Sequence, residues 1–183
     1  MSPAGRGATV AEPPSPTLTT FTDAVVVVGA DEQDEIDVDV DRWTRLARAV
    51  LETEQRRGEL TLTFVDRDEI AELNAEHLGR CGPTDVLSFP IDDDPTVRST
   101  GVPVLLGDVV VCPGVAADQA PAHAGTLDDE LALLVVHGVL HVLGHDHAEP
   151  DETAIMRDRE RELLEVHHWH GPAPDSFRQE HES

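Results

Sequence analysis

The sequence contains no lysine and no tyrosine, and aromatic residues make up only 3% of its 183 positions. Its core must therefore be aliphatic, and a hydrophobic content of 39% is enough to supply one. The two cysteines, Cys81 and Cys112, are too few for a disulfide framework, and neither belongs to a Cys-x-x-Cys pair. In the N-terminal part, the longest apolar run covers residues 24–28, which is too short to cross a bilayer. These absences predict a cytoplasmic protein without a membrane segment.

Basic residues are also scarce. Thirteen arginines stand against 37 aspartates and glutamates, so the formal net charge is −24. Such a chain repels phosphate backbones at long range, which excludes non-specific nucleic-acid binding through a broad basic surface. Between His77 and Pro90, however, the formal charge is zero because Arg80 offsets Asp85, so a short local contact with an anion is not excluded. An acidic coat that serves solubility explains the remaining charge equally well.

The length of the chain fits one domain with tails. Residues 1–22 are rich in Pro, Ser, Thr, Ala and Gly and lack apolar periodicity, which predicts a disordered N-terminal extension. The folded domain is predicted to span residues 23–167. Residues 168–183 are predicted to be a flexible C-terminal tail, because Gly171, Pro172 and Pro174 prevent a continuous helix.

Strand and helix patterns alternate within residues 23–167. Apolar runs or alternation predict strands at residues 24–28, 60–64, 86–89 and 104–111. Helical spacing predicts helices from about residue 41, around Ile70 and Leu73, at residues 115–120, from Thr126 to near Gly144, and at residues 151–166. This interleaving is typical of a single mixed sheet flanked by helices.

Three histidines near the end of the best-defined helix form the clearest chemical pattern. His137 and His141 are four residues apart, so their side chains leave the same helical face. Gly144 can adopt a positive φ and end the helix, which brings His147 within reach as a third ligand. Three imidazoles can hold Zn²⁺ at about 2.0–2.1 Å and leave a fourth position for water, as in catalytic zinc sites. We therefore predict one zinc ion per chain at these histidines.

A zinc peptidase is the first alternative, since the histidine spacing resembles the H-E-x-x-H-x-x-G-x-x-H run of metzincin proteases. In those enzymes the Glu after the first His is the general base. Gly138 occupies that position here and has no side chain to take a proton. Peptide hydrolysis by that mechanism is therefore disfavoured.

A more extensive resemblance points elsewhere. Residues 137–147 (HGVLHVLGHDH) resemble the H-G-x-L-H-x-x-G-[YH]-D-H signature of the YbeY-type endoribonucleases, which are rRNA maturation factors. Leu73 and Asn74, followed by residues 82–90 (GPTDVLSFP), are similar to the family's L-N…P-T-D-V-L-S-F-P segment. Residues 106–113 (LGDVVVCP) resemble its L-G-D-I-x-I-x-P strand. The blocks keep the family order, and the resemblance covers about residues 24–164.

The resemblance implies an α/β (mixed α+β) domain with a single, roughly four-stranded mixed sheet flanked by about five helices. It also implies that His137, His141 and His147 hold zinc in a cleft. The implied activity is cleavage of single-stranded RNA in 16S rRNA 3′-end maturation and ribosome quality control. The implied partners are the 16S rRNA precursor, the small ribosomal subunit and assembly factors, whereas neither DNA nor a membrane is expected as a partner.

The sequence departs from the family at one position of interest. The family often places an aromatic–Arg pair shortly after the Asn that corresponds to Asn74, and His77 and Leu78 stand there instead. The nearest cation is Arg80, for which we predict a contact with the scissile phosphate; a solvent-facing loop arginine is the alternative. We also consider Asp85 as a residue that orients a metal-ligating His or the attacking water, or that caps a turn after Pro83.

The missing arginine and the net charge of −24 leave a second functional class open. In that alternative, the protein is a ribosome-assembly or RNA-binding factor without catalysis. The zinc peptidase that lacks its usual Glu is a third and weaker candidate.

Overall fold

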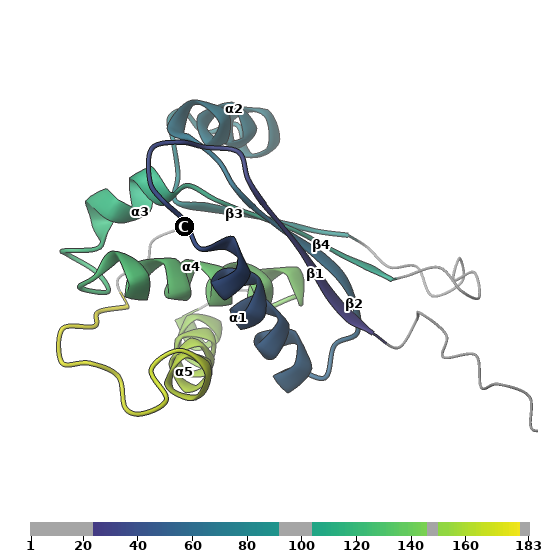
Figure 1. Ribbon diagram of the computed structural model, residues 1–183, viewed down its shortest axis with the longest axis vertical. Helices are drawn as coiled ribbons and strands as arrows, with labels where there is room; N and C mark the ends of the chain where they lie inside the picture. Colours follow the sequence, from purple (N-terminus) through teal and green to yellow (C-terminus); the bar gives the residue numbers. More distant parts are fainter. Residues whose placement is uncertain (1–23, 92–103, 146–149, 180–183) are drawn as a thin grey trace, which may run out of the picture.

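The computed structural model describes residues 24–91, 104–145 and 150–179 (Figure 1). Within these ranges the chain forms four strands and five helices. In chain order they are β1 (Val25–Asp31), α1 (Val40–Thr53), β2 (Gly58–Phe64), α2 (Arg67–Leu78), β3 (Val86–Pro90), β4 (Leu105–Val111), α3 (Pro113–Gln119), α4 (Leu127–Val142) and α5 (Pro150–His167). The predicted extension at residues 1–22 lies outside the described residues, and the predicted domain boundaries stay predictions.

The four strands form one sheet in the order β1-β2-β4-β3. Strand β2 pairs in parallel with both β1 and β4, whereas β3 runs antiparallel to β4. The predicted fold class, a mixed α/β domain with a single four-stranded sheet and five helices, is therefore confirmed. Strand β3 is an edge strand, and its outer side faces the site described below.

The two faces of the sheet are covered unequally. Figure 1 shows α1, α4 and α5 on one face and α2 on the other. The alternation along β4 follows this division, because Val109 and Val111 belong to the main core while Val110 packs with Ile70 of α2. Most of the largest fully buried side chains are leucines, as the scarcity of aromatic residues predicts.

Short polar residues fix the starts of α1 and α4. The carboxylate of Asp39 accepts a hydrogen bond from the Arg42 N–H at 3.0 Å and caps α1. The Thr126 hydroxyl accepts from the Asp129 N–H at 3.1 Å and caps α4, as predicted. Each cap of this kind contributes about 1 kcal/mol. Gly144, with a φ of 91°, follows the end of α4, which confirms its predicted positive φ.

Residues 168–179, which belong to the predicted C-terminal tail, lie against the rest of the domain. The rings of Trp169 and Phe177 contact each other edge to face at 4.7 Å between centroids, and Phe177 is buried. The Arg178 N–H donates to the carbonyl of His123 at 2.9 Å. This segment therefore contacts the loop between α3 and α4.

None of the helices in the described part of the chain combines the length and the apolar composition needed to span a membrane.

Candidate active site

A cleft of about 460 Å³ runs beside the edge strand β3. Its walls come from the end of α2 with the loop after it, from β3, which follows that loop, and from the C-terminal half of α4, which is distant in the sequence. The described residues that line it are His77, Leu78, Arg80, Val86, Leu87, Ser88, Phe89, Pro90, His137 and His141.

Two of the three predicted zinc ligands lie side by side on the α4 wall of this cleft. The rings of His137 and His141 are 4.5 Å apart between centroids and nearly perpendicular, at 74°. His137 is buried and His141 is partly exposed. The third predicted ligand, His147, lies outside the described residues, and no three His, Cys, Asp or Glu side chains within residues 24–91, 104–145 and 150–179 are grouped to hold a metal.

A buried glutamate from α5 supports the first of these histidines. The Oε1 atom of Glu160 lies 2.7 Å from Nδ1 of His137, and both side chains are buried. A carboxylate behind an imidazole fixes the tautomer and the ring orientation of a metal ligand. In this arrangement Nδ1 of His137 donates to Glu160, and the role of metal ligand falls to Nε2. The two described histidines, His137 and His141, are donors of the type that zinc binds, and Glu160 is an outer carboxylate of the type that supports such ligands.

The sequence marks Glu160 as unusual, but helical periodicity alone does not show what its side chain does. Helix α5 buries Met156, Leu163 and Leu164 on one side, and Glu160 falls on that same stripe. A carboxylate at an apolar position needs a polar or charged partner. Which residue supplies that partner depends on how α5 packs on α4, which helical spacing does not show.

Gly138 allows α4 to approach the sheet closely. A Cβ atom at this position would lie only 2.5 Å from Cγ1 of Val109 on β4. Nearby, the Ser88 hydroxyl donates to the Gly138 carbonyl at 3.2 Å and joins β3 to the helix. A side chain at position 138 would collide with the sheet, which explains why glycine stands where metzincin proteases carry their glutamate.

Arg80 lies on the opposite wall of the same cleft, as its predicted role requires. Helix α2 ends at Leu78 and is followed by Gly79, which has a φ of 65° and lets the chain turn. The buried Asn74 donates from Nδ2 to the Gly82 carbonyl at 2.9 Å and so holds the loop that carries Arg80. Leu78, which stands at the family's arginine position, also lines the cleft and is 54% exposed. The contact between Arg80 and a phosphate stays a prediction.

Asp85 is buried at the entrance to β3 and is not among the described residues that line the cleft. Its Oδ1 atom accepts hydrogen bonds from the Val86 N–H at 2.8 Å and from the Thr84 hydroxyl at 3.1 Å. Its backbone carbonyl accepts from the Cys112 N–H at 2.8 Å. These contacts are those of a residue that fixes the turn before β3, and a catalytic role for Asp85 stays untested.

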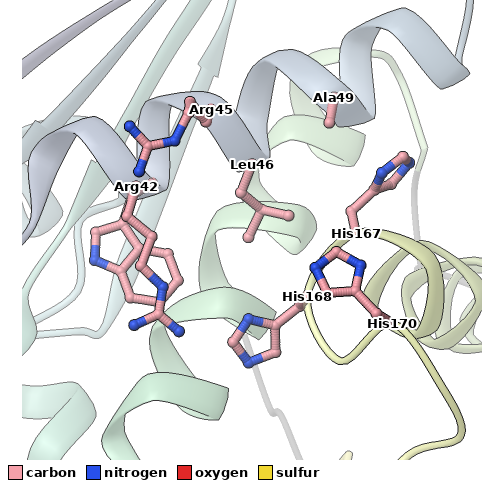
Figure 2. Close-up of a pocket in the computed structure, with 8 residues that line it drawn as sticks. Arg42, Arg45, Leu46, Ala49, His167, His168 and His170 are labelled. Carbon is pink, nitrogen blue, oxygen red and sulfur yellow. The ribbon is translucent and has the colours of Figure 1, made fainter.

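A second pocket, of about 230 Å³, lies between α1 and the end of α5. Figure 2 shows Arg42 and Arg45 on one side of Leu46, and His167 and His170 on the other. The Arg42 guanidinium is neutralised by Asp128, 2.8 Å away.

The histidines of this second pocket are held by partners within the chain. Nε2 of His167 lies 2.8 Å from the Thr53 hydroxyl, and Nδ1 of His170 lies 2.9 Å from the carbonyl of Val166. Burial lowers the pKa of His167, and the nearby His170 and Arg159 lower it further. The contact of His167 with Thr53 joins the end of α5 to the end of α1, and that of His170 with Val166 lies within the end of α5, so we assign the pocket to packing.

His168 takes part in a buried network at the start of α4. Its Nε2 atom lies 2.8 Å from Oδ1 of Asp129, and the Trp169 indole N–H donates to the same oxygen at 2.6 Å. Burial alone would raise the pKa of Asp129, but the hydrogen bonds from Trp169, Thr126 and His168 outweigh it and lower that pKa. The network ties the C-terminal segment to the N-terminus of α4.

The fold and the cleft together define an α/β protein with a histidine-lined site of the kind that metalloenzymes use. A comparison with family models identifies it further: the model described as Endoribonuclease YbeY matches residues 29–168. The chain therefore belongs to the Endoribonuclease YbeY family, which confirms the resemblance noted in the sequence.

Individual relatives agree with this assignment. The chain is 44% identical over 133 residues to a protein named Endoribonuclease YbeY from Thermobifida fusca, with 70% of this chain and 86% of the relative covered. It is 45% identical over 137 residues to a protein of the same name from Salinispora tropica, with 70% and 87% covered. The solution structure of TM1509 from Thermotoga maritima matches with a TM-score of 0.52 at 24% identity, covering 76% of this chain and 87% of that one. This last likeness concerns the fold alone.

Proposed function

We propose that this chain is a zinc-dependent endoribonuclease that cleaves single-stranded RNA in the cytoplasm. Its proposed substrate is the 3′ end of the 16S rRNA precursor, with a further role in ribosome quality control beside the small ribosomal subunit and its assembly factors. Membership of the Endoribonuclease YbeY family supports the class of reaction. The observation that carries the proposal is the His137–Glu160 pair beside the His141 ring, on the wall of a cleft that Arg80 also lines.

In this proposal His137, His141 and His147 hold the zinc ion. Bound there, zinc supplies a Lewis acid that activates water and offsets the negative charge that builds up on a phosphate. Glu160 keeps the His137 ring in one tautomer and orientation, so that little reorganisation is needed when the metal binds.

The opposite wall of the cleft supplies the contact with RNA. The Arg80 guanidinium is exposed and can donate two parallel hydrogen bonds to a phosphate. The lining contains no aspartate or glutamate among the described residues, so in a chain of net charge −24 the cleft places no carboxylate of this lining against a phosphate.

A second candidate function is RNA binding in ribosome assembly without cleavage. The exposed Leu78 favours it, because this residue occupies the position where relatives often carry the arginine linked to activity. The third candidate, a zinc peptidase, is disfavoured because Gly138 stands where such enzymes carry the glutamate that acts as general base.

Cleavage of single-stranded RNA by the purified protein tests the proposal. We expect cleavage that stops when a chelator is added and that is lost in His141→Ala. The matched control is His170→Asn, which removes an exposed histidine outside the cleft, at a position of positive φ that Asn tolerates. Cleavage by the control but not by His141→Ala supports the nuclease, whereas no cleavage by zinc-loaded wild-type protein would favour the binding role.

A further inference from the structure

The C-terminal segment reaches the glutamate that supports the candidate metal centre. The side-chain amide of Gln179 donates from Nε2 to Oε2 of Glu160 at 3.0 Å and to the backbone carbonyl of Arg157 at 2.7 Å. The other carboxylate oxygen, Oε1 of Glu160, lies 2.7 Å from Nδ1 of His137. One carboxylate thus joins the last described residue of the chain to a predicted zinc ligand.

The position of Gln179 is set by the residues just before it. Phe177 is buried against Trp169, and the Arg178 N–H donates to the His123 carbonyl at 2.9 Å. Trp169 is itself held by its hydrogen bond to Asp129. The segment is therefore held by contacts before and after the turn at residues 175–176. These contacts place the Gln179 amide beside Glu160, and they involve no residue of the cleft.

We propose that Gln179 is a positioning residue for the metal centre, acting on His137 through Glu160. A glutamate has three rotatable side-chain bonds, and a hydrogen bond to one oxygen leaves its carboxylate able to swing. A donor on the second oxygen removes that freedom and helps to compensate the buried charge. Fixing Glu160 fixes the His137 ring, so zinc affinity depends on a residue outside the family match at residues 29–168. This inference rests on the proposed zinc site.

The dissociation constant for zinc, measured by competition with a chromophoric chelator on the full chain, tests this role. We expect Gln179→Ala to bind zinc about three- to tenfold more weakly than the wild type, which is less than the loss expected when Glu160 itself is removed. Gln179→Glu should weaken binding at least as much, because it places a carboxylate against that of Glu160. The matched control is Arg178→Ala, whose zinc affinity should not change. Among the described residues, the Arg178 side chain donates to the carbonyls of Asp175 and Phe177, both within the segment.

Two further measurements separate positioning from a general structural effect. In the metal-free protein, the imidazole ¹⁵N shifts of His137 should change in Gln179→Ala while the melting temperature stays near that of the wild type. In a Glu160→Ala background, Gln179→Ala should have no further effect on zinc affinity, since the coupling passes through the carboxylate.

The outcomes distinguish this inference from the proposed function. Unchanged affinity and unchanged His137 shifts in Gln179→Ala overturn the role of Gln179 and leave the zinc site intact. An equal loss in Arg178→Ala, or a loss that persists without Glu160, also overturns it. A wild-type protein that binds no zinc overturns both.

Discussion

Each end of α4 takes part in a histidine–carboxylate pair, and the distance between the ring nitrogen and the carboxylate oxygen is almost the same in the two pairs. Near the C-terminal end, His137 and Glu160 lie 2.7 Å apart, and near the N-terminal end, His168 and Asp129 lie 2.8 Å apart. In both pairs the carboxylate is buried, and in both the two partners come from different segments of the chain.

Their surroundings differ, and this difference separates a candidate site from a structural contact. Both carboxylates accept further protein donors, Trp169 and Thr126 for Asp129 and Gln179 for Glu160, so the difference lies at the histidines. The His168 ring lies beside the rings of Trp43 and Trp169. His137 instead adjoins a second imidazole, His141, on the wall of a cleft. A histidine–carboxylate pair therefore does not by itself identify a metal site, and the site proposed at His137 rests in addition on the adjoining His141 ring.

Removing each carboxylate in turn gives the largest expected effect. Glu160→Ala should weaken zinc binding about 10- to 100-fold, because outer carboxylates of metal-ligating histidines contribute that much. Asp129→Ala should lower stability and should weaken zinc binding no more than Gln179→Ala does, because Asp129 reaches the metal site only indirectly, through Trp169 and the segment that carries Gln179. Chelator competition on both variants makes the comparison, and equal zinc affinities in the two would show that the two ends are not functionally distinct.

The main effect of Asp129 should be on the stability of the fold. Asp129→Asn removes the charge that three donors hold, and we expect the free energy of unfolding at neutral pH to fall by about 1.5–2 kcal/mol. Because the pKa of Asp129 is lowered in the fold, its stabilising contribution is complete above the ordinary aspartate pKa of about 3.9 and is lost as the pH falls through the lower folded value.

Denaturant unfolding of the wild type and Asp129→Asn from neutral to acid pH measures both effects. The two stabilities should converge in acid. A stability difference that stays constant over this pH range would mean that the carboxylate charge of Asp129 does not stabilise the fold.

Disturbing the close contact between α4 and the sheet should change the stability of the fold by a smaller amount. Gly138→Ala should lower stability by about 1 kcal/mol, since the collision of its Cβ with Val109 outweighs the better helix propensity of alanine. Val109→Ala should relieve that cost, so the double variant tests the contact directly by thermal or denaturant unfolding. If the two substitutions destabilise additively, the contact is not the reason for glycine at this position.

Arg80 gives the smallest expected change and tests the opposite wall of the cleft. Arg80→Ala should slow cleavage of single-stranded RNA about three- to fivefold, the effect of losing one exposed phosphate contact, without reducing zinc content. Arg178→Ala serves as an arginine control outside the cleft. Unchanged cleavage in Arg80→Ala would remove Arg80 from the mechanism.

The fold could be predicted from the sequence because its determinants are local. Apolar alternation defined β2, and the capping hydroxyl of Thr126 together with the positive φ of Gly144 marked the two ends of α4. The strand order depends on long-range pairing, which no local pattern contains. The pattern predicted that β4 and the other strands share one sheet, but not that β3 lies at its edge.

In the candidate site, too, the local spacing of residues could be predicted from the sequence, whereas contacts that depend on packing could not. Helical spacing placed His137 and His141 on one face, and the structure brings their rings together. Glu160 and Gln179 were not identified, because their roles arise from the packing of α5 and the following segment against α4. The interrupted apolar stripe of α5 marked Glu160 as unusual without naming its partner.

Elemental analysis of the purified chain tests the central claim most directly. We predict one zinc ion per chain in the wild type, its loss in the double variant His137→Ala/His141→Ala, and its retention in Asp129→Ala. A wild-type protein without zinc, or a double variant that keeps its full complement, would contradict the account.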